Sequence, residues 1–138
     1  MPFVHISLRQ GTSIAYRHAI ADGVHKALVD AIGIPNADRF QVITEHDLAN
    51  LIYDEHYLVD NARTEGIVFI QITFVQGRTS EMKQDLYHRI AENLTRNPGL
   101  RAEDVFITLV ENSPADWSVG NGEAQLLKRL KEETGLRK

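Results

Sequence analysis

Phe3-Val-His-Ile-Ser-Leu-Arg-Gln-Gly-Thr-Ser13 recurs in the second half of the chain as Phe69-Ile-Gln-Ile-Thr-Phe-Val-Gln-Gly-Arg-Thr-Ser80, with one additional residue, Arg78, after the glycine. Each copy alternates apolar and polar residues, as a strand does, and then reaches a Gln-Gly turn and a hydroxyl side chain that can cap a helix. Farther along, Asp38-Arg-Phe-Gln-Val-Ile-Thr-Glu45 and Asp104-Val-Phe-Ile-Thr-Leu-Val-Glu111 repeat at the same shift. The chain therefore contains an internal duplication, and this duplication determines the predicted fold.

The residues between the repeated strands have the periodicity of amphipathic helices. The first apolar stripe ends at Gly33 and Pro35, and the second ends at Asn97-Pro98-Gly99, which are typical helix stops. The stripes consist of Ile20, Val24, Ala27, Leu28, Ala31 and Ile32 in the first copy, and of Met82, Leu86, Ile90 and Leu94 in the second. Each copy is thus predicted to form a strand, a helix and a second strand.

These elements predict an α/β (α+β) fold. Two β-α-β units, about 2–45 and 67–112, form one four-stranded sheet, and a helical crossover places both helices on one face of that sheet. A polar stretch, 46–66, joins the two units within a single domain, 1–138. A short amphipathic segment, 123–133, follows and could dock on a neighbouring subunit or on its own sheet.

Two helices on one face leave the other face of the sheet without cover from the same chain. We expect the strands to present apolar residues there, and an oligomer would bury them. The residues expected to need this cover are Val4, Ile6, Ile70, Ile72, Ile107 and Leu109. The alternative is a sheet face that water simply solvates.

The composition excludes several classes of function. The 15 basic residues are spread among 19 acidic ones, so no basic block offers a surface for nucleic acid. There is no cysteine, which excludes disulfides, thiolate metal sites and a cysteine nucleophile. The apolar runs are far shorter than the roughly 18 residues that span a bilayer. We therefore expect a cytoplasmic protein that binds neither nucleic acid nor membrane.

The six histidines do not form a recognisable metal motif. His18 and His25 are seven residues apart, and His46 and His56 lie in the polar stretch. No pair has the i, i+4 spacing of the common zinc motif, and nothing marks a third ligand. We expect no metal and no other cofactor.

Three residues can carry chemistry. Once Met1 is removed, Pro2 has a secondary amine at the start of a buried strand, which suits a general acid or base. Arg78 lies where a strand gives way to a helix, so it can grip a carboxylate, although a solvated arginine in a turn is the alternative. Asp38 precedes the second strand and could reach the Pro2 nitrogen if the two strands pair in parallel. Its counterpart Asp104 also permits a purely structural interpretation.

Taken together, Pro2, the duplication and Asp38-Arg39-Phe40-Gln41 resemble the tautomerase superfamily, and within it the malonate semialdehyde decarboxylase branch. The resemblance covers about residues 2–127. Its other segments are Gln76-Gly-Arg-Thr-Ser-Glu-Met-Lys83 and Val110-Glu-Asn-Ser-Pro-Ala-Asp-Trp-Ser-Val-Gly120. The resemblance implies a homotrimer.

The resemblance also implies roles for individual residues. Pro2 would be the catalytic acid or base, Asp38 would support it, and Arg78 would bind the substrate carboxylate. Trp117 would form part of the pocket wall. Some decarboxylases of this branch have a second arginine two residues before the first. This chain has Gln76 there, so its substrate-binding site would carry less positive charge.

The leading hypothesis is a cofactor-free tautomerase that acts on a small 2-oxo acid through Pro2. The alternatives are a malonate semialdehyde decarboxylase-like lyase, and a hydratase or dehalogenase that acts on an unsaturated acid. A non-enzymatic trimer that serves as a binding or scaffold protein is a further alternative, because a fold alone does not fix a function.

Overall fold

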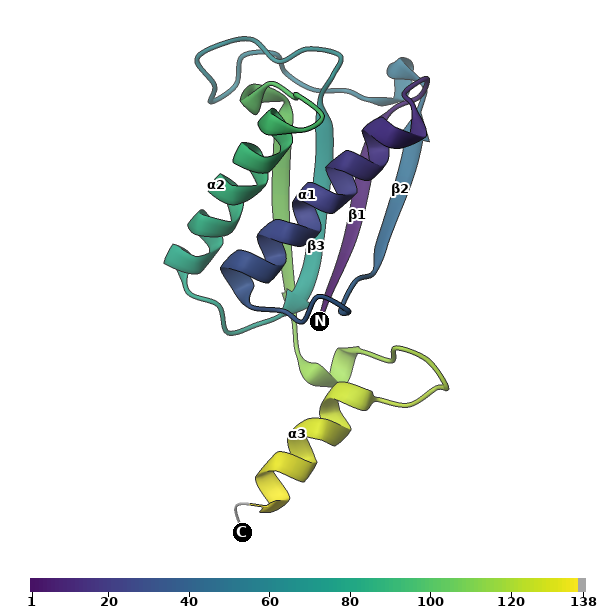
Figure 1. Cartoon of the computed structure of the whole chain (residues 1–138), viewed down its shortest axis with the longest axis vertical. Helices are drawn as coiled ribbons and strands as arrows, with labels where there is room; N and C mark the ends of the chain where they lie inside the picture. Colours follow the sequence, from purple (N-terminus) through teal and green to yellow (C-terminus); the bar gives the residue numbers. More distant parts are fainter. Residues whose placement is uncertain (137–138) are drawn as a thin grey trace.

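The computed structural model describes residues 1–136 and shows a sheet, two helices packed on it, and a third helix that extends away from it (Figure 1). The elements follow the predicted order. The strands are β1 (Pro2–Arg9), β2 (Gln41–His46), β3 (Val68–Val75) and β4 (Val105–Asn112), and the helices are α1 (Ile14–Ile32), α2 (Ser80–Arg96) and α3 (Gln125–Leu136). Within these residues, no helix is both long and apolar enough to cross a membrane.

The sheet has the order β2-β1-β3-β4. Each β-α-β unit contributes a parallel pair, and the two units join through the antiparallel pair of β1 and β3. This mixed sheet, with α1 and α2 side by side on one face (Figure 1), confirms the predicted α+β fold. As a result of the strand directions, β1 and β2 begin at the same sheet edge where β3 and β4 end.

The core lies between the sheet and the two helices. Val4, Ile6 and Leu8 of β1, and Ile70, Ile72 and Phe74 of β3, are all buried there. They pack against buried residues of the helices: Ile20, Val24 and Leu28 of α1, and Leu86, Ile90 and Leu94 of α2. Side chains alternate along a strand, so each strand has one set of residues in this core and the other set on the opposite face.

The sequence therefore predicted the wrong residues for the uncovered face of the sheet. Val4, Ile6, Ile70 and Ile72 face the helices, and Ile107 and Leu109 pack partly against the same core. The uncovered face, here called the open face, carries the alternate positions. Its large apolar members are Phe3, Val42, Phe69, Phe106 and Val110, of which all but Phe69 are exposed. An apolar open face is thus present, made of other side chains.

Both long helices begin with the same cap at the same place in the repeat. The Tyr16 amide donates to the Ser13 hydroxyl, and the Met82 amide donates to the Thr79 hydroxyl. Ser13 and Thr79 are separated by the same shift as the repeated strands, so the copies align without a gap up to the helix starts. The sequence suggested that Arg78 is an additional residue, and the structure shows that it is not. It replaces Thr12 of the first copy.

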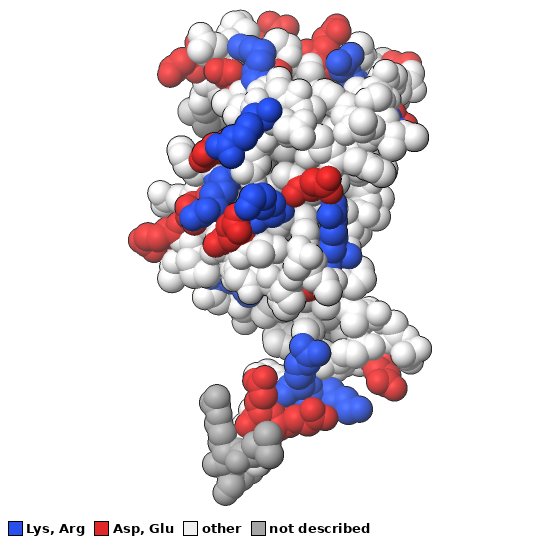
Figure 2. Space-filling model, viewed as in Figure 1, with Lys and Arg blue, Asp and Glu red and all other residues white. Residues whose placement is uncertain are grey.

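Helix α3 does not pack on its own sheet, which leaves a neighbouring subunit as the other predicted docking surface. It projects away from the sheet below the strand ends (Figure 1), and it contacts the short turn Pro114–Asp116 and, through Gln125, the backbone of Val119 and Gly120. On the face that carries α1 and α2, basic and acidic side chains are interspersed (Figure 2). Three i, i+4 ion pairs contribute to this pattern: Lys26–Asp30, Arg89–Asp85 and Arg96–Glu92.

Candidate active site

The start of the chain is fixed at the sheet edge where β1 and β2 begin. Pro2 is buried and pairs with Phe74 of β3. Two residues later, the backbone amide of Val4 donates to the Phe40 carbonyl at 3.0 Å. Pairing on both sides prevents the fraying that is usual for a chain terminus. With Met1 attached, the Pro2 nitrogen is a tertiary amide and cannot act as a base. Removal of Met1 would leave a secondary amine at this anchored position.

Asp38 lies beside the start of the chain, as predicted. Its Oδ2 atom is 3.3 Å from the Met1 ammonium nitrogen, and each side chain is only 13% exposed. Its Oδ1 atom is buried and has no hydrogen-bond partner among the described residues. Buried carboxylate oxygens normally have partners, so this atom is available to a ligand or a water molecule.

Asp104, at the same position in the second copy, has a different environment. Its side chain is 2% exposed, and its two oxygens accept hydrogen bonds from the Thr64 amide at 2.7 Å and the Thr64 hydroxyl at 2.5 Å. These bonds attach the chain before β3 to the start of β4. Asp104 therefore has the structural role that its position suggested, whereas Asp38 lacks the partners for that role.

Arg78 reaches the same edge from the turn between β3 and α2. Its guanidinium carbon lies 5.5 Å from the centre of the Phe74 ring, and Nη1 donates to the Val75 carbonyl at 2.9 Å. Phe74 is the strand partner of Pro2. The half-buried guanidinium thus lies above the residue next to the chain start, with donors left over for a carboxylate.

Trp117 and Gln76 both bond to Asn112, at the ends of β3 and β4. The Trp117 indole donates to the Asn112 side chain at 2.7 Å, and the backbone amide of Gln76 donates to the backbone carbonyl of Asn112 at 2.7 Å. Asn112 therefore holds the tryptophan beside the turn that carries Arg78. The Gln76 side chain is exposed, and no pattern in the sequence had singled out Asn112.

An ion pair that no pattern in the sequence had singled out, Lys83–Glu111, lies next to Arg78. Lys83 Nζ is 2.6 Å from Glu111 Oε1. The pKa of the Glu111 carboxyl is lowered, first by its hydrogen bond to Lys83, and also by the Gly77 amide and the Arg78 charge. The repeat offered a signal, because Glu111 coincides with Glu45 when the two copies are aligned.

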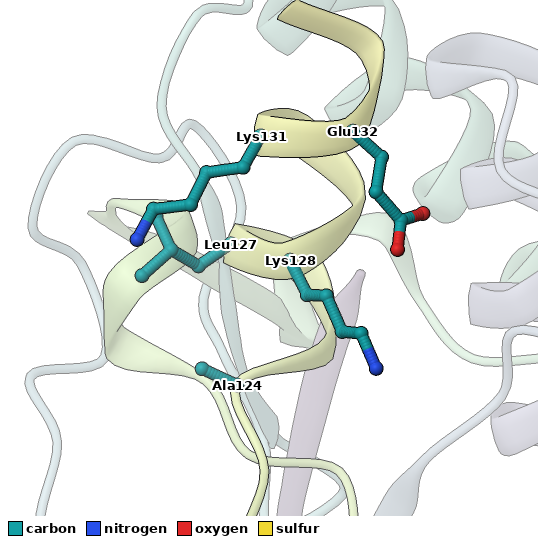
Figure 3. Close-up of a pocket in the computed structure, with 5 residues that line it drawn as sticks. All are labelled: Ala124, Leu127, Lys128, Lys131 and Glu132. Carbon is teal, nitrogen blue, oxygen red and sulfur yellow. The ribbon is translucent and has the colours of Figure 1, made fainter. Parts of the chain in front are cut away.

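A cavity of about 420 Å³ lies elsewhere, along α3 (Figure 3). Its lining comes entirely from the C-terminal segment: Ala124, Leu127, Lys128, Lys131 and Glu132. It is thus separate from the edge that holds Pro2. Within residues 1–136, no group of three or more His, Asp or Glu side chains is arranged to hold a metal ion.

Known proteins similar to this chain include tautomerases. Two family models described as "Tautomerase enzyme" match residues 38–120 and 2–61. The probable tautomerase YusQ of Bacillus subtilis (strain 168) is 40% identical over 128 residues, which is 93% of this chain and 100% of that protein.

Solved structures agree with these matches. The crystal structure of FG41 malonate semialdehyde decarboxylase inhibited by 3-bromopropiolate is 40% identical, covers 93% of this chain and 96% of its own, and superposes with a TM-score of 0.87. A fused 4-OT that forms a symmetric trimer shares the fold, with a TM-score of 0.72 over 91% of this chain and 98% of its own at 23% identity. The chain belongs to the tautomerase family of enzymes.

Proposed function

We propose that the protein is a cofactor-free tautomerase that acts on a small 2-oxo acid through the amine of Pro2. One observation carries the proposal: Pro2 is buried and paired with Phe74, so removal of Met1 would leave an amine fixed at this sheet edge. Asp38, beside the chain start, would orient the substrate through Oδ1, which has no partner among the described residues. Arg78, over the strand partner of Pro2, provides the group that would bind the carboxylate of the substrate. Trp117 would close the pocket on the side of β4.

In this mechanism, Pro2 is neutral after Met1 has been removed. Its nitrogen takes the proton from the carbon next to the carbonyl, and the electron pair of the broken C–H bond moves into the carbonyl to give an enolate. Pro2 then returns the proton to carbon or oxygen. Arg78 holds the carboxylate throughout, so the reacting carbon stays within reach of the amine. The exposed Gln76 offers neutral hydrogen bonds to the substrate where a second arginine would offer charge.

Decarboxylation of a small 3-oxo acid is the second candidate, and the position of Asp38 favours it. A carboxylate close to an amine stabilises the protonated amine, which is an acid. A cationic Pro2 would donate a hydrogen bond to the 3-oxo carbonyl. The C–C bond to the carboxylate would then break, carbon dioxide would leave, and the electron pair would form an enolate whose oxygen takes the proton from Pro2 to give the enol. The 40% identity to a malonate semialdehyde decarboxylase supports this variant.

We further propose that the enzyme is a cytoplasmic homotrimer. The open face presents Phe3, Val42, Phe106 and Val110 to solvent on a single chain, and burial of such side chains favours association. The fused 4-OT with the same fold forms a symmetric trimer. The partners of the chain would then be a small carboxylate and copies of itself.

The decisive experiment combines intact mass with kinetics on the same sample. The proposal predicts that native protein lacks Met1, and that Pro2→Ala lowers kcat at least about 100-fold on phenylenolpyruvate or on malonate semialdehyde. The better of the two substrates distinguishes the tautomerase from the decarboxylase. Circular dichroism checks that the variant folds.

A preparation that retains Met1 in part of the molecules is the internal control. Its rate should scale with the methionine-free fraction. Full activity in protein that keeps Met1, or an unchanged rate in Pro2→Ala, would remove Pro2 from the mechanism.

A further inference from the structure

Glu111 lies in the same row of the sheet as Pro2. Pro2 pairs with Phe74 across β1 and β3, and Phe74 pairs with Glu111 across β3 and β4. The Arg78 guanidinium lies over the middle residue of this row. Glu111 is thus one strand away from the residue that supports Arg78, on the side of the sheet that faces the helices.

The Glu111 carboxylate connects β4 with the start of α2. It accepts a 2.6 Å hydrogen bond from Lys83 in the first turn of α2, and the Gly77 amide and the Arg78 charge in the preceding turn also lower the pKa of this carboxyl. Gly77 has a φ of 123°, so this turn takes a backbone shape that other residues rarely adopt. Glu111 therefore ties β4 to the first turn of α2, directly after the short segment that carries Arg78.

The first repeat contains the same ion pair at the opposite edge of the sheet. Arg17 and Glu45 occupy the positions of Lys83 and Glu111 in the aligned copies, and Arg17 Nη1 is 3.0 Å from Glu45 Oε1. Arg17 also donates to the carbonyl and the hydroxyl of Thr12, the residue that Arg78 replaces. In both copies, the pair lies against the turn between strand and helix. Only in the second copy does that turn carry a candidate substrate-binding residue.

We infer that Glu111, held by Lys83, is a positioning residue that fixes the Gly77–Arg78 turn so that the Arg78 guanidinium meets the substrate carboxylate. The inference rests on the proposed role of Arg78. Glu111 does not touch the substrate in this scheme. Its loss would weaken the grip on the carboxylate while leaving the amine of Pro2 in place.

The test compares Glu111→Gln with Glu45→Gln, which removes the same kind of ion pair from the copy without Arg78. Steady-state kinetics use phenylenolpyruvate or malonate semialdehyde, whichever the wild type converts faster. We expect Glu111→Gln to raise KM about tenfold with kcat within about threefold of wild type, because a displaced guanidinium binds the carboxylate poorly. Glu45→Gln should leave KM within about twofold while lowering Tm by a similar amount.

A charge-swapped variant, Lys83→Glu with Glu111→Lys, separates positioning from simple pairing. The swap restores an ion pair and should restore Tm, but a lysine at position 111 places a positive charge beside the turn and repels Arg78. KM should therefore stay high. Restoration of KM by the swap, or equal KM in Glu111→Gln and Glu45→Gln, would overturn the inference.

Arg78→Ala distinguishes this failure from a failure of the proposed function. A KM that rises in Arg78→Ala, together with a Glu111→Gln variant that behaves like Glu45→Gln, leaves the proposed function intact and removes only the positioning role. If Arg78→Ala leaves KM unchanged, Arg78 is not the carboxylate ligand. The positioning role of Glu111 and the proposed binding role of Arg78 then fall together, and the Pro2→Ala result decides separately on the amine.

Discussion

Asp38 and Asp104 occupy equivalent positions in the two repeats and have opposite environments. Asp104 has both oxygens bonded by Thr64, whereas Asp38 has one buried oxygen without a partner among the described residues. A structural carboxylate saturates its acceptors, and a group kept for chemistry leaves an acceptor free. Comparison of these two residues can thus separate function from stability within one chain.

We predict that Asp38→Asn lowers kcat by about 100-fold and changes the free energy of unfolding by less than about 1 kcal/mol. The matched variant Asp104→Asn should do the reverse, because an amide cannot accept on both sides. It should cost about 1–3 kcal/mol in chemical denaturation and leave kcat of the folded protein nearly unchanged. Equal kinetic effects of the two substitutions would assign Asp38 a structural role as well.

At this scale, the sequence was sufficient to nominate Pro2, Asp38 and Arg78, which the structure brings to one edge of the sheet. It was not sufficient to distinguish Asp38 from Asp104, because the partner of Asp104 is Thr64, which lies outside the repeat. The sequence also misplaced Arg78 as an additional residue, since Thr12-Ser13 and Thr79-Ser80 match by letter. The cap hydrogen bonds show which hydroxyl begins each helix.

Helices α1 and α2 approach closely at Gly23. A Cβ atom built on Gly23 would lie 2.7 Å from Leu94 Cδ2 and 3.4 Å from Asn93 Cβ, and Leu94 is fully buried. The Asn93 side chain also donates to the Gly23 carbonyl at 3.0 Å. Glycine is therefore needed here for space, and its backbone is held by the neighbouring helix.

We predict that Gly23→Ala destabilises the protein by about 1–2 kcal/mol, since overpacking exceeds the gain in helix propensity. Gly135→Ala in α3 is the control, because a Cβ there meets nothing within 4 Å. It should not lower stability. Urea denaturation of both variants measures the difference. A Gly23→Ala variant as stable as wild type would mean that Leu94 repacks without cost.

For the whole molecule, the open face is the surface whose role depends on assembly. Val110 lies on it and is 41% exposed, whereas Ile14, at the start of α1, is 64% exposed and lies away from the sheet. We predict that Val110→Asp dissociates the proposed homotrimer in analytical ultracentrifugation, and that Ile14→Asp does not. An association state unaffected by Val110→Asp would exclude this face as the interface.

The sequence predicted an uncovered face but assigned the wrong residues to it. In β1, both Val4 and Phe3 are apolar, and a period of two does not state which set faces the helices. That choice depends on where α1 and α2 cross the sheet, which is a property of the assembled fold.

The second copy of the β-α-β unit repeats the first strand that carries Pro2, but not the end of the chain. Val68 takes the place of Pro2 in the second copy, inside a continuous backbone, so its nitrogen can never be a free amine. The proposed mechanism thus gives each chain one reactive terminal amine for two structural halves. Labelling with an inhibitor directed at the proposed active site should saturate at one equivalent per chain. At the equivalent edge of the second copy, which has no terminal amine, Asp104 instead attaches to Thr64.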